Sequence, residues 1–143
     1  MKTKQFSNEE DLLKLAAKVV REAEKNAEAN PTSNEIQIVI VEPNKAPYKK
    51  TIPNDLKEMQ GIVGGWIESI TIGSTGSGAQ IAMIVNEEGR LIDLPLNRIV
   101  SRLGMIVGTF FITAYNFEGD NVTLSDPEAD RLIRKFKSME VYI

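Results

Sequence analysis

The side chains of this 143-residue chain that could bind or transform a ligand are carboxylates, arginines, asparagines, lysines and aromatic rings, because the chain has no histidine and no cysteine. Ser-His-Asp and Cys-His catalysis, zinc fingers and disulfide frameworks each need one of those two residue types. The composition therefore leaves carboxylate, lysine, tyrosine or backbone chemistry, or binding without chemistry. We expect neither a metal ion nor a cofactor.

One group of polar and aromatic residues suits a nucleotide. Asn97, Arg98 and Arg102 fall in a segment that we expect to be a loop. Arginine presents a planar fork to phosphate, asparagine can read a base edge, and aromatic rings of the following strand can stack on a base. The alternative is that Arg98 pairs with Asp93 or Glu87 and that the phenylalanines divide between core faces. The predicted ligand-binding residues are Asn86, Asn97, Arg98, Arg102, Phe111 and Tyr115.

Paired carboxylates offer a second possibility. Glu87 and Glu88, with Asp93 close in sequence, could perform acid-base work or hold a divalent cation. Adjacent residues on a strand point to opposite faces, so these two glutamates converge only through turn geometry. A solvated turn with Gly89 at its left-handed position is the competing interpretation.

A glycine-rich stretch at residues 73–78 could hold a phosphate through backbone N–H groups. However, it lacks the Lys-Ser/Thr pair of a phosphate-binding loop, and no helix is expected after it. The pattern therefore predicts a flexible hairpin loop.

The chain is expected to begin with an amphipathic helix over residues 7–29. Ser7 and Glu10 have the spacing of a capping box, and Pro31 ends the helix. We predict residues 1–34 as a helix and linker for oligomerisation or packing, and residues 35–143 as the main domain. Whether the helix packs on its own sheet or on a second copy stays open, although a homo-oligomer is expected. The apolar stripe of the helix is Leu12, Leu15, Val19 and Ala23.

The main domain alternates short apolar runs with turn residues. Asn54 or Asp55 is expected to cap a short helix that ends at Gly64-Gly65, and Ser125 a final helix. The pattern predicts an α+β fold, a mainly antiparallel β-sheet domain with two short helices, preceded by the N-terminal amphipathic helix. The predicted strands cover residues 36–41, 48–52, 66–72, 79–86, 90–94 and 105–115, with a break at 94–98.

Charge and hydropathy restrict the partners. The net charge of −3 argues against a nucleic-acid polymer as the main partner. No stretch reaches the roughly 20 apolar residues of a membrane span, and charged residues interrupt the N-terminal segment, so it does not resemble a signal peptide. We therefore expect a cytoplasmic protein with a small-molecule ligand and no membrane association.

Short motifs occur in a fixed order along the main domain. They are Val39-x-Val41-Glu42-Pro43 with Pro47 after it, Asn54-Asp55-Leu56-x-x-Met59-Gln60-x-x-Val63-Gly64-Gly65-x-Ile67-Glu68, Asn86-Glu87-Glu88-Gly89-x-Leu91, Leu94-Pro95-x-Asn97-Arg98, and Val107-Gly108-Thr109-Phe110-Phe111. The ordered set resembles the family catalogued as domain of unknown function 3846 over about residues 36–136. That family is found largely in bacteriophages, plasmids and their Gram-positive hosts.

The resemblance implies a biological setting and no activity that transfers residue by residue. Small phage accessory proteins often counter host defence, and one route is to sequester a nucleotide that serves as an immune signal. We therefore expect a non-enzymatic, phage-type anti-defence protein that binds a cyclic oligonucleotide or an ADP-ribose derivative. The alternatives are a protein–protein inhibitor, such as an antirestriction-like decoy of a host nucleic-acid enzyme, and a nucleotide hydrolase that uses Glu87, Glu88 or Asp93.

Overall fold

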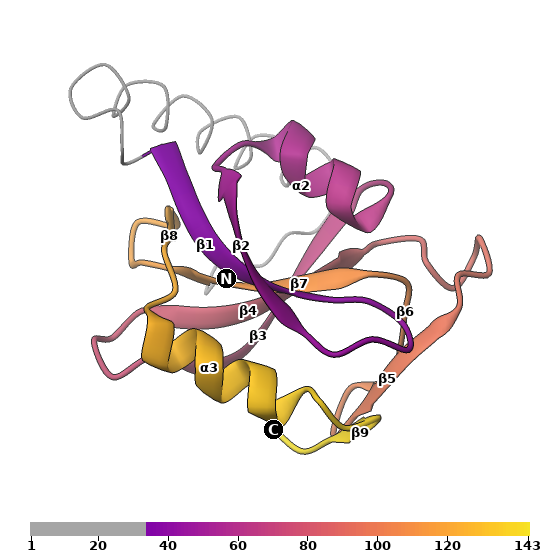
Figure 1. Cartoon of the computed structure of the whole chain (residues 1–143). Coiled ribbons are helices and arrows are strands. Elements are labelled where there is room, and N and C mark those ends of the chain that lie inside the picture. The colour runs from indigo at the N-terminus through magenta and orange to yellow at the C-terminus, as the bar shows by residue number, and fades with distance from the viewer. Residues whose placement is uncertain (1–33) are drawn as a thin grey trace.

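The computed structural model describes residues 34–143, so the predicted helix over residues 7–29 and its apolar stripe lie outside the described residues. Two sheets and two helices make up the described part (Figure 1). The larger sheet has the strand order β2-β1-β7-β4-β3, with β8 paired to β7, and all its pairs are antiparallel. Its strands are β1 (Glu35–Val41), β2 (Tyr48–Pro53), β3 (Ile67–Ser74), β4 (Gln80–Asn86), β7 (Phe110–Tyr115) and β8 (Asn121–Val122).

The smaller sheet has the order β6-β5-β9. Strand β5 (Leu96–Val100) pairs antiparallel with β6 (Gly104–Val107) and parallel with β9 (Glu140–Val141). The α+β class and the mainly antiparallel pairing are thus as predicted.

The two helices cover opposite faces of the larger sheet (Figure 1). Helix α2 (Leu56–Val63) buries Met59 and Val63 in one core cluster, and α3 (Asp126–Lys135) buries Ala129 and Leu132 in the other. The apolar residues of β1 alternate between these clusters. A strand buried on both faces reads as a continuous apolar run, which explains the sequence of residues 36–41.

Both helices begin where their capping residues predict. Asp55 Oδ1 accepts a hydrogen bond from the Glu58 backbone N–H at 2.7 Å, and Ser125 Oγ accepts one from Glu128 at 3.4 Å. Helix α2 ends at Gly64, which has a left-handed φ of 82°.

The predicted strand over residues 90–94 is wrong, because residues 87–93 form consecutive turns. The predicted break over residues 94–98 is also wrong in part, since β5 begins at Leu96 despite Pro95. Pro95 has no N–H to donate, but its carbonyl oxygen accepts a hydrogen bond of 2.7 Å from the Gly108 N–H. Pairing with β6 therefore extends right up to the proline.

The single strand predicted over residues 105–115 is two strands, β6 and β7, which belong to different sheets. Gly108 separates them with a φ of 75°, a conformation that a β-strand does not contain. A Cβ on Gly108 would lie 2.6 Å from Leu94 Cδ1, so the close approach of Leu94 also requires glycine.

Candidate functional site

Two of the predicted ligand-binding residues, Asn97 and Arg98, lie on β5 and are almost completely buried, at 1% and 4% exposure. Asn97 Nδ2 donates hydrogen bonds to the carbonyls of Val41 at 2.9 Å and Gly108 at 2.8 Å. Asn97 therefore holds the end of β1 against the link between β6 and β7.

The Arg98 guanidinium joins three separate segments. Its Nε donates to the Phe136 carbonyl at 2.8 Å, its Nη2 to the Lys45 carbonyl at 2.8 Å, and its Nη1 to Asn97 O and Oδ1 at 3.0 and 2.8 Å. Burial lowers the pKa of Arg98. The Phe136 carbonyl closes the C-terminal end of α3, where the helix dipole favours a cation. Arg98 pairs with neither Asp93 nor Glu87, and its partners are carbonyl oxygens.

Asn86, at the end of β4, is also buried. Its Nδ2 donates to the Val63 carbonyl at 3.0 Å, and its Oδ1 accepts from the Glu88 N–H at 2.8 Å. Asn86 therefore links the last turn of α2 to the turn that follows β4, and both ends of its amide are engaged within the protein.

The remaining three predicted residues lie apart from this group. Phe111 is completely buried in the core beneath α2, and Tyr115 lies farther along the same face of β7, where its Oη is 2.6 Å from Thr71 Oγ1. Arg102 is exposed in the turn between β5 and β6, with a left-handed φ of 72°. The structure thus brings Asn97 and Arg98 into contact with each other and does not gather the six residues around one pocket.

The carboxylates Glu87, Glu88 and Asp93 are exposed within the turns over residues 87–93. The Glu87 N–H donates to the Trp66 carbonyl at 2.8 Å, and Asp93 has a φ of 58°. Among residues 34–143, no group of three or more acidic, histidine or cysteine side chains is placed to hold a metal ion. A hairpin loop joins β3 and β4, as predicted, but it covers residues 75–79, since Gly73 and Ser74 still belong to β3; the Thr75 N–H donates to the Ala79 carbonyl.

An open pocket of about 640 Å³ lies between α2 and the β1–β2 hairpin. Apolar side chains of Ile40 and Ile62 form part of its wall, together with the ring of Tyr48, which is 39% exposed. Gly61 and Thr109 complete the uncharged lining. Sequence reasoning missed this pocket, because its shape depends on how β1, β2 and α2 pack together and on Thr109, which lies far from them in the chain.

The polar network on one wall of the pocket centres on Glu42. Tyr48 Oη donates a hydrogen bond of 2.5 Å to Glu42 Oε2, and Lys45 Nζ lies 3.4 Å from Glu42 Oε1. The hydrogen bond from Tyr48, with help from the lysine, lowers the pKa of Glu42. The same bond, with a smaller contribution from burial, raises the pKa of Tyr48 to about 12. This network orients the tyrosine ring along the pocket.

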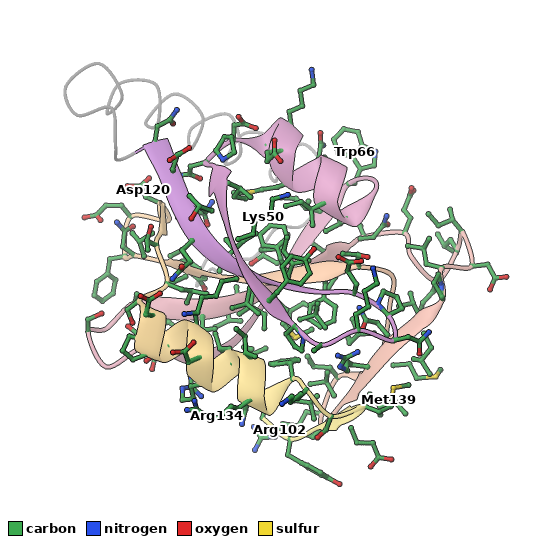
Figure 2. All side chains as sticks on the ribbon, in the orientation of Figure 1. Lys50, Trp66, Arg102, Asp120, Arg134 and Met139 are labelled. Carbon is green, nitrogen blue, oxygen red and sulfur yellow. The ribbon has the colours of Figure 1, made fainter. Side chains whose placement is uncertain are left out.

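Two cations, Lys50 on β2 and Lys57 in the first turn of α2, also line the pocket. Lys50 lies on the side of β2 that faces α2 (Figure 2). Within the described part of the chain, neither lysine forms an ion pair. The other pocket carboxylates are Glu58 and Asp55, and Asp55 is used to cap α2. The pocket therefore carries two ammonium groups, which can meet an anionic group of a ligand, beside three carboxylates.

The family described as Domain of unknown function (DUF3846) matches residues 36–137, and the chain belongs to it. No curated protein and no solved structure matches the chain. Over the described residues, no helix has the length and apolar character needed to cross a membrane. Glu42, Asp55 and Thr109 of the pocket belong to the motifs quoted above for this family.

Proposed function

We propose that this protein binds a small phosphate-bearing ligand of the nucleotide class in the pocket between α2 and the β1–β2 hairpin, and that it sequesters the ligand without changing it chemically. The proposal moves the predicted nucleotide site from the buried Asn97 and Arg98 to an open surface lined by Tyr48, Lys50 and Lys57.

The proposal rests mainly on Gly61, a glycine inside helix α2 that lines the pocket. Glycine inside a helix destabilises it by roughly 0.5–1 kcal/mol relative to alanine, so it needs a reason. No described atom lies within 4 Å of the position that a Cβ on Gly61 would occupy, so packing against residues 34–143 does not demand glycine there. A larger side chain would instead project into the pocket, and the missing side chain keeps that space open.

The chemistry of the lining suits a nucleotide. The ammonium groups of Lys50 and Lys57 can meet phosphate oxygens in charge-assisted hydrogen bonds. The ring of Tyr48 and the side chain of Ile62 offer apolar surface for a base, and Glu58 can accept hydrogen bonds from amino or hydroxyl groups. The pocket thus combines charged groups of both signs with an apolar wall, and small-ligand sites commonly join apolar surface to a few polar groups.

Two of the three pocket carboxylates are engaged within the protein, which favours binding without turnover. Glu42 is held by Tyr48 and Lys45, and Asp55 is held by the first turn of α2. We place this activity in a phage-type anti-defence role, in which the ligand is a cyclic oligonucleotide or an ADP-ribose derivative that signals infection.

The test is titration calorimetry of the full chain with cyclic dinucleotides, cyclic trinucleotides and ADP-ribose derivatives. Gly61→Gln should weaken binding at least tenfold while raising the melting temperature slightly, because glutamine is a good helix former. Gly73→Gln is the matched control, since the Cβ of that residue would also meet open space but lies on β3, outside the pocket. It should bind like the wild type.

Heating the complex and separating the released ligand by chromatography then distinguishes sequestration from catalysis. An intact ligand supports sequestration, whereas a product would show turnover. The proposal is refuted if the wild type binds none of these compounds, or if Gly61→Gln binds as tightly as the wild type.

A further inference from the structure

The outer face of the small sheet carries an unusual number of exposed apolar side chains. Leu96 and Ile99 on β5, Met105 on β6 and Tyr142 after β9 are 37%, 38%, 54% and 73% exposed. We infer that this outer face is the surface through which two copies of the chain associate.

The exposed side chains form one continuous surface. Ile99 and Met105 are direct partners across the β5–β6 pair, so their side chains lie side by side. The Ile99 N–H donates to the Met139 carbonyl at 2.9 Å, so the segment beside Ile99 also carries Met139, which is 46% exposed. Figure 2 shows Met139 at the margin of the small sheet.

The turns over residues 87–93 extend the surface beyond β6. Arg90 Nη2 donates to the Met105 carbonyl at 2.6 Å, which fastens these turns to the strand. Leu91 and Ile92 follow directly and are 84% and 53% exposed. They are exposed apolar side chains of the turns that Arg90 fastens to β6.

The inner face of the small sheet already has its core. Val100, Ile106 and Val141 are buried against the larger sheet, so the outer apolar residues are not needed for folding in isolation. At roughly 200 Å² for a fully exposed large side chain, the exposed fractions of Leu96, Ile99, Met105 and Tyr142 amount to about 400 Å². An area of about 400 Å² matches the largest apolar patch of a typical monomer, about 300–600 Å², and a patch of that size is often a functional surface.

Charge and edge geometry favour a second copy as the occupant. Glu140 is the β9 partner of Ile99, and the Arg90 guanidinium lies against the Met105 carbonyl, so the surface carries both signs of charge. A two-fold axis can then place acidic against basic groups, which makes the surface self-complementary. Because Arg90 occupies the outward carbonyl of β6, we expect the copies to meet face to face and not by adding strands.

Sedimentation velocity of the full chain over a range of concentrations tests the inference. The wild type should have the mass of two chains. Met105→Glu and Ile99→Glu should each raise the dimer dissociation constant roughly thirtyfold or more, because each buries a carboxylate in the apolar interface. Phe117→Glu is the matched control, since Phe117 is fully exposed on the β7–β8 hairpin, and it should remain dimeric.

Melting curves of the same variants should match that of the control at concentrations where all are monomeric, which separates loss of the interface from loss of the fold. A wild type that stays monomeric at every concentration overturns the inference and leaves the face to a different protein. A dimer that survives Met105→Glu and is lost in Leu15→Glu also overturns it, and places the interface on the predicted N-terminal helix.

Discussion

Replacing Arg98 by alanine should lower the free energy of unfolding strongly, although the sequence alone suggests that Arg98 binds a ligand. The guanidinium donates hydrogen bonds to Phe136, Lys45 and Asn97 from a side chain that is only 4% exposed. Truncation leaves these acceptors buried and without their donor, and it also releases the amide oxygen of Asn97.

The expected loss follows from the number of bonds and from their environment. A hydrogen bond to a charged group contributes about 1.5–3 kcal/mol, and Arg98 makes four of them. Burial opposes the charged form, as the lowered pKa of Arg98 shows, so part of that sum is offset by desolvation. We expect a net loss of about 3–5 kcal/mol in the free energy of unfolding, comparable to breaking a buried ion pair.

Urea unfolding followed by circular dichroism measures this loss. With an m-value of about 1–2 kcal/mol/M, the midpoint should fall by roughly 1.5–5 M. Arg102→Ala is the control, because Arg102 is exposed and surface substitutions stay within about 0.5 kcal/mol. Arg98→Lys keeps the positive charge but loses the planar guanidinium, so its urea midpoint should lie between those of Arg98→Ala and Arg102→Ala. Equal midpoints for Arg98→Ala and Arg102→Ala would show that the buried bonds contribute nothing.

Two further predictions concern Gly108 and Tyr48. Gly108→Ala should destabilise the fold by about 1–3 kcal/mol, because it places a Cβ at a left-handed φ of 75° and against Leu94. Gly61→Ala, the control, should not destabilise the fold. The urea midpoints of the two variants test this, and equal midpoints would contradict the role of Gly108. The folded pKa of Tyr48, about 12, exceeds the ordinary value of 10.0, so the stabilisation from its bond to Glu42 is complete below pH 10 and is lost as pH rises toward 12. Tyrosinate absorbance should show a late phase that disappears in Tyr48→Phe and moves to lower pH in Glu42→Gln; a late phase that persists in Tyr48→Phe would assign it to another tyrosine.

The elements that the sequence predicted well are those with local causes. Asp55 and Ser125 accept hydrogen bonds from residues three positions later, so their spacing alone indicates where α2 and α3 begin. The apolar run of β1 likewise reports burial on both faces, without reference to any distant residue.

The misplaced elements depend on distant partners. Strand β5 forms despite Pro95 because β6 and β9 pair with it on either side, and β9 lies some forty residues along the chain. The break at Gly108 goes with the close contact between Gly108 and the Leu94 side chain, and no local sequence pattern predicts that contact. Pairing and packing at long range therefore decided the second half of the domain.

The candidate site was missed for the same reason. Arg98 finds its acceptors 38 and 53 residues away, so its chemistry, which suits a phosphate, is used on backbone carbonyls. An arginine has the same fork geometry toward a carbonyl at a helix C-terminus as toward an anion. Residue type alone could not distinguish an arginine that binds phosphate from one that binds carbonyl oxygens. The burial of Arg98 in the structure makes that distinction.

The buried asparagine and the open pocket are nevertheless connected through the backbone. Asn97 Nδ2 holds the carbonyls of Val41 and Gly108, and the residues that follow these two, Glu42 and Thr109, line the pocket. Arg98 in turn holds the carbonyl of Lys45, whose side chain pairs with Glu42. Asn97 and Arg98 are thus positioning residues for a pocket that they do not line. A variant at either position should weaken ligand binding only to the extent that it loosens the fold, whereas Gly61→Gln should weaken binding in a protein that is at least as stable as the wild type.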